Sequence, residues 1–296
     1  MSRVRLTTSS WLIGSLCIRG FSHRLWVVTI VSVLASVLAC HGTNEDAAVA
    51  SPPAEEATWA PLDFRIETRM AESEKGGRLI VFLHGYGSDG ADHLAWTRTL
   101  LDDRTRLILP TAPLRHASGR GAMWWEFRED DWPKPYPADP ASPAPPSFSA
   151  QLPLARDAVV RLITRLRDQF APETVILAGH SQGAMLALDV AVVTEPPPDR
   201  VVLLSGYALL DSVPNITRLR ETPPAVLISH GRSDPVVPFN SAKDMRRLLE
   251  ENGFSVDFKE FAGGHGIESS VVAAVSAFVG PAVSPRVSDE EATDAH

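Results

Sequence analysis

Cysteine is scarce in this chain: its 296 residues include only two, Cys17 and Cys40. Two cysteines exclude a disulfide framework, and because both precede the globular part, the folded domain has no thiol chemistry. Basic residues are also in deficit. The first 40 residues contain four arginines and no acidic residue, so the rest of the chain carries 24 Lys and Arg against 36 Asp and Glu, a balance of −12. A surface this acidic gives no electrostatic basis for binding nucleic acid.

Only one apolar run is long, and it lies near the N-terminus. Residues 25–39 (LWVVTIVSVLASVLA) are too few for a bilayer span of about 20 residues, but they fit the hydrophobic region of an export signal behind a basic start. The run ends in VLAC at Cys40, which resembles the lipobox of bacterial lipoproteins, in which the cysteine is lipidated and becomes the mature N-terminus. The alternatives are an uncleaved anchor helix and an ordinary signal peptide followed by an unrelated cysteine.

The lipoprotein interpretation divides the chain into four parts. Residues 1–40 are the signal peptide, and residues 41–58 are small, acidic and proline-containing, as is typical of a disordered tether. Residues 59–280 form one globular domain, and the acidic residues 281–296 form a disordered tail. We therefore expect an exported protein that is anchored to the membrane through lipidated Cys40 and faces the periplasm or the cell exterior.

The globular part alternates strand and helix patterns. Five runs rich in Val, Ile and Leu predict buried strands: Arg78–Leu83, Arg106–Leu109, Thr174–Ala178, Val201–Leu204 and Ala225–Ser229. Further patterns predict helices over Leu152–Phe170, Gln182–Val193, Ser241–Asn252 and Ile267–Val279, and a last strand over Phe254–Phe261. Because the strands are hydrophobic throughout, the expected fold class is α/β, an open and mostly parallel sheet with helices on both faces. Residues 118–150 interrupt the pattern with a loop insertion rich in Pro and Trp.

The sequence Gly179-His180-Ser181-Gln182-Gly183 lies directly between a predicted strand and a predicted helix. In a nucleophile elbow the serine occupies a sharp strand-to-helix turn that exposes its hydroxyl, and side chains at the two glycine positions would collide with neighbouring backbone. The helix N-terminus adds N–H groups where an oxyanion would form. The pattern alone is also compatible with a structural turn and an inert serine, so the partners of the serine must distinguish the two.

A serine hydroxyl needs a histidine to take its proton, and the histidine needs an acid to fix its tautomer. On this fold the chain order is serine, acid, histidine, so both partners must follow Ser181. His265 lies in a glycine-rich loop between the last strand and the last helix, and Asp234 lies in the turn after the strand that ends near His230. Because such loops meet at one edge of a parallel sheet, the sequence predicts a triad of Ser181, Asp234 and His265.

Other residues are alternatives for these roles. Asp211 follows a strand and is the second candidate for the acid, whereas Asp199 and Asp257 lie at the wrong strand ends. His230 as the base would have to use Asp211, and its expected role is instead to support the turn at Asp234. A metal site is a further alternative, without any known ligand spacing, and would comprise His84, His230 and His265.

An oxyanion hole needs a second backbone N–H from the loop after an early strand. The glycine-rich residues 84–90 (HGYGSDG) follow the predicted strand Arg78–Leu83, and their glycines allow the backbone amides to point inward. The amides of Tyr86 and Gln182 are therefore the expected pair of donors. The alternative for this loop is a simple glycine-rich turn.

Six motifs in order resemble the phospholipase/carboxylesterase group of α/β hydrolases, the acyl-protein-thioesterase-like enzymes. They are LHGYGSDG, LPTAP at 109–113, MWWEF at 123–127, AGHSQGAM at 178–185, HGRSDPVVP and GGHGI. The resemblance covers about residues 78–279. It implies an α/β-hydrolase fold, Ser181 as nucleophile, Asp234 as orienting acid, His265 as base and oxyanion donors from Tyr86 and Gln182. The chain departs from the family in a loop enlarged by the proline-rich segment 132–147, which leaves the acyl-chain preference open.

We therefore expect a serine carboxylic-ester hydrolase that acts on short- to medium-chain esters through an acyl-enzyme and needs no metal or cofactor. Trp124 and Trp125 are candidate substrate-binding residues, although with Trp132 they could instead pack the loop. A peptidase or an acyltransferase would use the same triad, and a catalytically inactive anchored binding protein is the alternative that is not an enzyme. The expected partners are a small-molecule ester and, through Cys40, the membrane.

Overall fold

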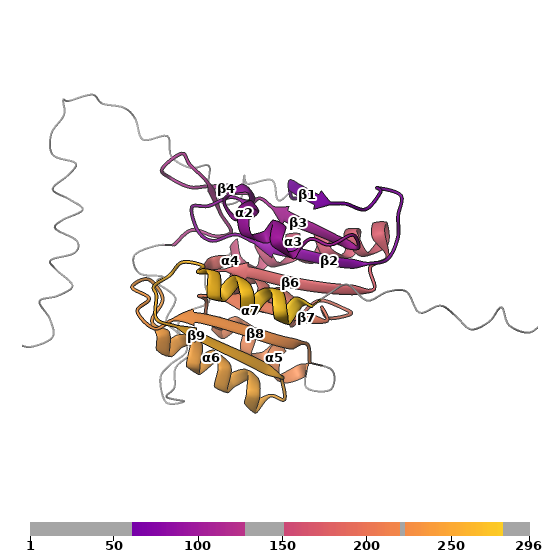
Figure 1. The fold of residues 1–296 in the computed structure, drawn as a ribbon. Coiled ribbons are helices and arrows are strands. Elements are labelled where there is room, and N and C mark those ends of the chain that lie inside the picture. The colour runs from indigo at the N-terminus through magenta and orange to yellow at the C-terminus, as the bar shows by residue number, and fades with distance from the viewer. Residues whose placement is uncertain (1–60, 128–150, 220–222, 281–296) are drawn as a thin grey trace, which may run out of the picture. The chain divides into compact units, whose positions relative to one another are not determined.

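A computed structural model describes residues 61–127, 151–219 and 223–280 of the chain (Figure 1). The predicted signal peptide with Cys40, the tether and the tail lie outside the described residues, as does the part of the predicted loop insertion from residue 128 onward. In the described ranges, no helix combines the length and the apolar character that crossing a membrane requires.

A seven-stranded sheet forms the centre of the domain, in the order β1-β3-β2-β6-β7-β8-β9. Its strands are β1 (Phe64–Thr68), β2 (Arg78–Leu83), β3 (Thr105–Pro110), β6 (Thr174–His180), β7 (Arg200–Leu204), β8 (Ala225–Gly231) and β9 (Val256–Phe261). All neighbouring strands pair in parallel except β1, which runs antiparallel to β3 at one edge. Every residue of β2 and β3 is buried, as continuous hydrophobic runs predict for strands covered on both sides. The predicted α/β fold class is confirmed.

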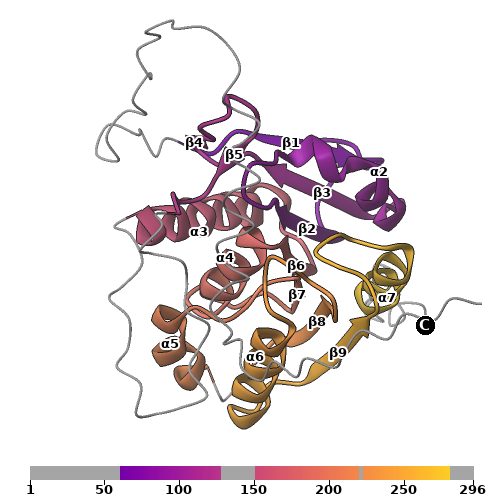
Figure 2. The ribbon, with the colours of Figure 1, turned by 90° about the vertical axis from the view of Figure 1, so that its left-hand side faces the viewer.

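Helices cover both faces of this sheet (Figure 2). One face carries α3 (Gln151–Phe170), α4 (Gln182–Ala191), α5 (Val213–Arg218) and α6 (Phe239–Glu251), and the other carries α2 (Leu94–Thr97) and α7 (Ser269–Val279). Short 3-10 turns lie at η1 (Gly90–His93), η2 (Arg98–Leu100) and η4 (Leu210–Ser212). Successive residues of β2 point to opposite faces, so Val81 belongs to the hydrophobic core under α3 and α4, while Phe82 belongs to the core under α7.

Every predicted strand and helix is present, with ends that differ from the prediction by at most two residues. The strand β1 was not predicted, because its residues are half-buried or exposed and form no continuous apolar run. A two-stranded ladder of β4 (Leu114–Arg115) and β5 (Ala122–Met123) was also not predicted. Residues 118–127, expected to begin the loop insertion, therefore include part of the ordered domain.

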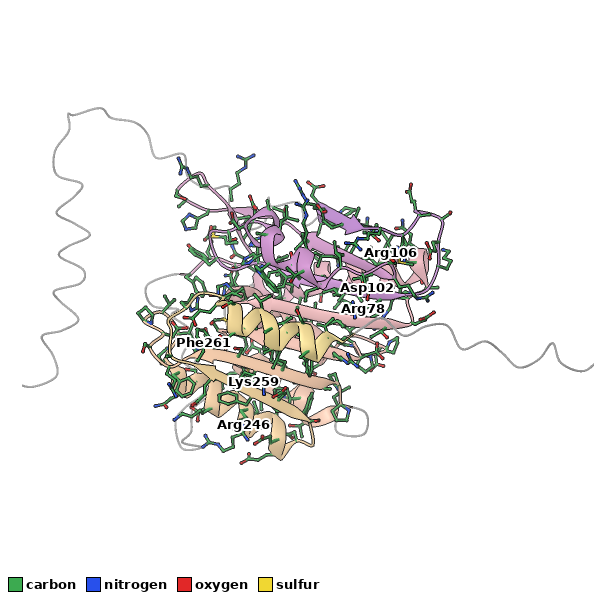
Figure 3. All side chains as sticks on the ribbon, in the orientation of Figure 1. Arg78, Asp102, Arg106, Arg246, Lys259 and Phe261 are labelled. Carbon is green, nitrogen blue, oxygen red and sulfur yellow. The ribbon has the colours of Figure 1, made fainter. Side chains whose placement is uncertain are left out.

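Buried arginines secure the end of the sheet where β2 and β3 begin (Figure 3). The guanidinium of Arg78 donates to Leu100 O at 3.1 Å, to Asp102 Oδ2 at 3.0 Å and to the last carbonyls of α7. Arg106 donates to carbonyls of the segment before β2 and lies 4.5 Å from the ring centroid of Phe170. These two arginines therefore have structural partners. The loops that carry the predicted triad lie at the opposite end of the sheet, where the parallel strands end.

Candidate active site

Ser181 forms the turn between β6 and α4 by itself, because β6 ends at His180 and α4 begins at Gln182. Its backbone has φ 54° and ψ −119°, a left-handed conformation that is costly for a residue with a side chain. The Ser181 amide donates to Leu204 O at 2.8 Å, which holds the turn against the end of β7. Ser181 therefore occupies the strained strand-to-helix turn that the sequence predicts.

The two glycines of the motif allow this close packing. A Cβ on Gly179 would lie 2.2 Å from Gly183 O, and a Cβ on Gly183 would lie 2.2 Å from Leu83 O. Both distances are far below van der Waals contact with backbone atoms that have no freedom to move. Only glycine at both positions lets α4 start directly over the ends of β6 and β2.

The three residues predicted as a triad meet at one end of the sheet. Nε2 of His265 lies 2.8 Å from Ser181 Oγ, and Nδ1 of His265 lies 2.7 Å from Asp234 Oδ2. The Asp234 side chain is fully buried, whereas 20% of the His265 side chain is exposed. His265 comes from the loop between β9 and α7, which lies at the left-hand end of the sheet in Figure 1. A proton path therefore connects three segments that are distant in the sequence.

The Asp234 carboxylate accepts three hydrogen bonds and has a second imidazole nearby. Oδ1 accepts from the amides of Val236 and Val237 at 2.8 and 2.9 Å. Oδ2 accepts from His265 and lies 3.2 Å from Nε2 of His230. Burial raises the pKa of Asp234, but the hydrogen bonds from His265, Val237 and Val236 outweigh it, so the pKa lies below its ordinary value. Asp234 is therefore held as a carboxylate beside His265.

The alternative acids do not reach His265. Asp199 accepts a hydrogen bond from the Val175 amide at the start of β6, and Asp257 pairs with Lys259 on the exposed edge strand. Asp211 lies in η4, and of the described acidic residues Asp234 alone contacts His265.

His230 and His84 have structural partners rather than a shared ligand. The His230 side chain is completely buried, and its Nε2 donates to Val237 O at 2.9 Å, which supports the turn at Asp234 as expected. Burial keeps the pKa of both imidazoles below the ordinary value. Among the residues that the structure describes, no group of three His, Cys, Asp or Glu side chains could hold a metal ion.

His84 orients the peptide that precedes the Tyr86 amide. Its Nε2 accepts from the Ala112 amide at 3.0 Å, so in the neutral ring the proton is on Nδ1, which donates to Gly85 O at 2.8 Å. The N–H of a trans peptide points away from its carbonyl, so the Tyr86 N–H faces away from His84. Gly85 also packs against the elbow, since a Cβ there would lie 3.3 Å from Ser181 Cβ.

Gln182 starts α4, so its amide is one of the N–H groups without a helical partner. Within the described parts of the chain, neither this amide nor that of Tyr86 donates to another group. Both amides therefore have a free N–H, and their role as oxyanion donors stays a prediction.

Trp124 and Trp125 lie beneath the site and do not line it. Their side chains are 0% and 1% exposed. The Gln182 side chain joins them to the elbow, because its Oε1 accepts from the Trp124 amide at 2.9 Å and its Nε2 donates to Trp125 O at 2.8 Å. The structure thus differs from the expectation of direct substrate contact, since both indoles pack in the core and position the segment that leads to Phe127.

A cavity of about 400 Å³ opens beside the serine and the histidine. Apart from Ser181 and His265 it is lined by apolar and aromatic side chains: Tyr86, Phe127, Met185, Tyr207, Val236 and Val237. Tyr86 and Val236 are two of the large hydrophobic residues that are substantially exposed in the described ranges, which places apolar surface at the cavity. Apart from Tyr86, these residues were not predicted from the sequence, where they resemble ordinary core positions.

Comparison with known proteins identifies the family of this chain. The family model for Phospholipase/Carboxylesterase matches residues 66–281 of the chain. Acyl-protein thioesterase 1 of Gibberella zeae is 27% identical over 222 residues, which is 70% of this chain and 91% of that protein. The range matched by the family model includes Ser181, Asp234 and His265.

Solved structures of an esterase and a thioesterase have a similar fold. Esterase PE8 is similar with a TM-score of 0.57 and 25% identity, covering 74% of this chain and 97% of that one. Acyl-protein thioesterase 2 of Zea mays, at 22% identity, shares the fold with a TM-score of 0.55 and coverage of 73% and 97%. The chain belongs to the phospholipase/carboxylesterase family of α/β hydrolases and is an ester hydrolase of the serine hydrolase class.

Proposed function

We propose that the protein hydrolyses carboxylic esters of short- to medium-chain acids through a Ser181–His265–Asp234 triad and a covalent acyl-enzyme. The observation that carries this proposal is the continuous hydrogen-bonded chain from Ser181 Oγ through the imidazole of His265 to Asp234. The Asp234 carboxylate accepts from Nδ1–H, which leaves the lone pair on Nε2 directed at the serine hydroxyl.

In the first half of the reaction, Ser181 Oγ forms a bond to the ester carbonyl carbon while its proton moves to Nε2 of His265. The carbonyl oxygen becomes an oxyanion, which the amides of Tyr86 and Gln182 stabilise. The bond to the alcohol oxygen then breaks, and His265 returns the proton to the departing alcohol.

In the second half, a water molecule attacks the acyl-enzyme. His265 takes a proton from this water, and the same two amides stabilise the second oxyanion. Collapse releases the acid, and the proton returns from His265 to Ser181 Oγ. Every proton is thus accounted for by one imidazole, and the carboxylate of Asp234 stabilises its cationic form.

The cavity beside Ser181 supports the choice of substrate. Its walls are formed by side chains such as Phe127, Met185 and Val237, which favour an apolar group over a charged one. Its volume of about 400 Å³ lies at the small end of the range for ligand pockets, which suits a short- to medium-chain acyl group.

Hydrolysis of p-nitrophenyl esters graded from two to sixteen carbons tests this proposal. We expect the highest kcat/KM at short to medium acyl length and a loss of about 10⁴-fold or more in Ser181→Ala, with the melting temperature preserved. A Ser181→Ala variant that keeps its rate would disprove the nucleophile, and a preference for the longest chains would disprove the proposed acyl range.

We also propose that the enzyme is exported and attached to the membrane through lipidated Cys40. The support is the sequence alone: a basic start, the apolar residues 25–39 and the VLAC motif that ends at Cys40. Metabolic labelling with palmitate should mark the wild-type protein and not the Cys40→Ala variant. A wild-type protein that takes up no label and partitions into the aqueous phase of a detergent extraction would disprove the anchor.

A further inference from the structure

The loop that carries His265 is held at its start, where the Ser233 amide donates to Gly263 O at 3.0 Å, but its glycines leave the rest of the backbone little restrained. The sequence around it is Gly263-Gly264-His265-Gly266, and glycines lose more conformational freedom on ordering than any other residue. The imidazole is fixed at both nitrogens by Ser181 and Asp234, but these bonds must break and re-form as protons move. A catalytic base on such a loop therefore needs a separate anchor for its main chain.

His180 supplies one such anchor. Its Nε2 lies 2.7 Å from the carbonyl oxygen of His265, and within the described ranges this is the only hydrogen bond of the His265 main chain. A carbonyl only accepts, so Nε2 of His180 carries the proton. The two rings also pack against each other, with centroids 5.0 Å apart and planes inclined by 49°.

His180 stays uncharged while it makes this bond. Burial, only partly opposed by the hydrogen bond to His265, lowers the pKa of His180 to about 3. Gly85 lies against its Nδ1, where an added Cβ would come within 3.3 Å, and the ring of His93 lies on another side with its centroid 5.8 Å away. The pKa of His93 is also lowered by burial, to about 4. A neutral neighbour adds no charge that would oppose formation of the His265 cation.

We propose that His180 is a positioning residue: its Nε2–H holds the main chain of the His265 loop and so fixes the base relative to the nucleophile. His180 directly precedes Ser181, so one stretch of backbone carries the nucleophile and anchors the loop of its base. This inference rests on the proposed function, because it assigns His265 the role of the base. It extends that proposal to the variable position of the Gly-X-Ser-X-Gly motif, which is His180 in this chain.

Two substitutions at this position distinguish the effect of the hydrogen bond from the effect of the volume that the ring fills. His180→Phe keeps an aromatic ring but removes the donor, whereas His180→Gln places an amide NH₂ where Nε2 of histidine lies. A displacement of the order of 1 Å at a catalytic group costs about 10²-fold in rate. We therefore expect His180→Phe to lower kcat by 10- to 100-fold with KM within twofold, and His180→Gln to restore kcat to within about threefold of wild type.

His93→Phe is the matched control, because His93 packs against the His180 ring but makes no hydrogen bond to the His265 loop. We expect its kcat to stay within threefold of wild type. All variants are assayed at one temperature, well below the lowest melting temperature among them, so that each is folded.

Hydrogen exchange of residues 262–266, measured by mass spectrometry, provides a readout that does not depend on activity. Faster exchange in His180→Phe, with wild-type exchange in His180→Gln, would support the anchor even if the ester reaction itself were disproved by Ser181→Ala. Unchanged exchange in His180→Phe, an unchanged kcat in that variant, or a His180→Gln variant as slow as His180→Phe would each overturn the inference.

Discussion

Replacing Asp234 with asparagine tests the orienting role of the carboxylate, because the surrounding amides fix which way the new side chain faces. Oδ1 of Asp234 accepts from the amides of Val236 and Val237, so asparagine must keep its carbonyl oxygen there. Its NH₂ group then replaces Oδ2, 2.7 Å from Nδ1 of His265. Nδ1 must become the acceptor, the proton of the neutral ring moves to Nε2, and His265 has no lone pair for the Ser181 proton.

This change of tautomer sets the expected magnitude. The same exchange lowers kcat by about 10⁴ in serine proteases, and at 1.36 kcal/mol for each factor of ten this is about 5 kcal/mol of lost transition-state stabilisation. We expect Asp234→Asn to lose about 10⁴ in kcat for a p-nitrophenyl ester, with KM nearly unchanged, because the apolar cavity is unaltered.

The matched control is Asp211→Asn, which changes the alternative acid in η4 and should keep kcat within twofold of wild type. The assay is initial-rate hydrolysis at pH 8, with circular dichroism to establish that each variant is folded. A loss of less than tenfold in folded Asp234→Asn, or an equal loss in Asp211→Asn, would refute the reasoning.

Three further predictions concern stability. Gly183→Ala should lower the free energy of unfolding by about 3 kcal/mol or more in urea titrations, whereas Gly266→Ala, whose Cβ meets no atom within 4 Å, should change it little; equal effects would contradict the packing at the elbow. The buried hydroxyl of Tyr207 has no hydrogen-bond partner among the described residues, so Tyr207→Phe should raise the free energy of unfolding by about 1–3 kcal/mol; a loss would show that the hydroxyl is paired. The pKa of Asp234 is lower in the folded state than its unfolded value of about 3.9, so the ionised carboxylate stabilises the fold at any pH above about 3.9. This stabilisation is lost as the pH falls through the pKa of the folded state. The difference in melting temperature between wild type and Asp234→Asn should therefore be smaller at pH 3 than at pH 5, and a difference that stays the same down to pH 3 would contradict it.

The buried parallel strands were predictable because each is a continuous apolar run that only a doubly covered sheet accommodates. The edge strand β1 was not, because it is only five residues long, includes the charged residues Arg65 and Glu67, and forms no continuous apolar run. Its pairing with β3 depends on the tertiary context, in which it covers the open edge of the sheet.

The site likewise contains residues that the sequence predicts and residues that it does not. Ser181, Asp234 and His265 stand out because their chemistry demands a fixed chain order and because glycines surround two of them. The partners of Trp124 and Trp125 could not be predicted, since a buried indole and a pocket-lining indole have the same sequence signal. His180 occupies a position of the motif that has no required side chain, so its contact with His265 became visible only when the β9–α7 loop was placed over the elbow.

We propose Ser181 as a nucleophile that His265 makes reactive. Reaction with a fluorophosphonate probe, followed by peptide mapping, measures this directly because the probe bonds covalently to an activated serine and not to an ordinary one. We predict one adduct, on the peptide that contains Ser181, with no labelling of Ser181→Ala and much slower labelling of His265→Ala. Folded wild-type protein that remains unlabelled, or an adduct on a different serine, would contradict it.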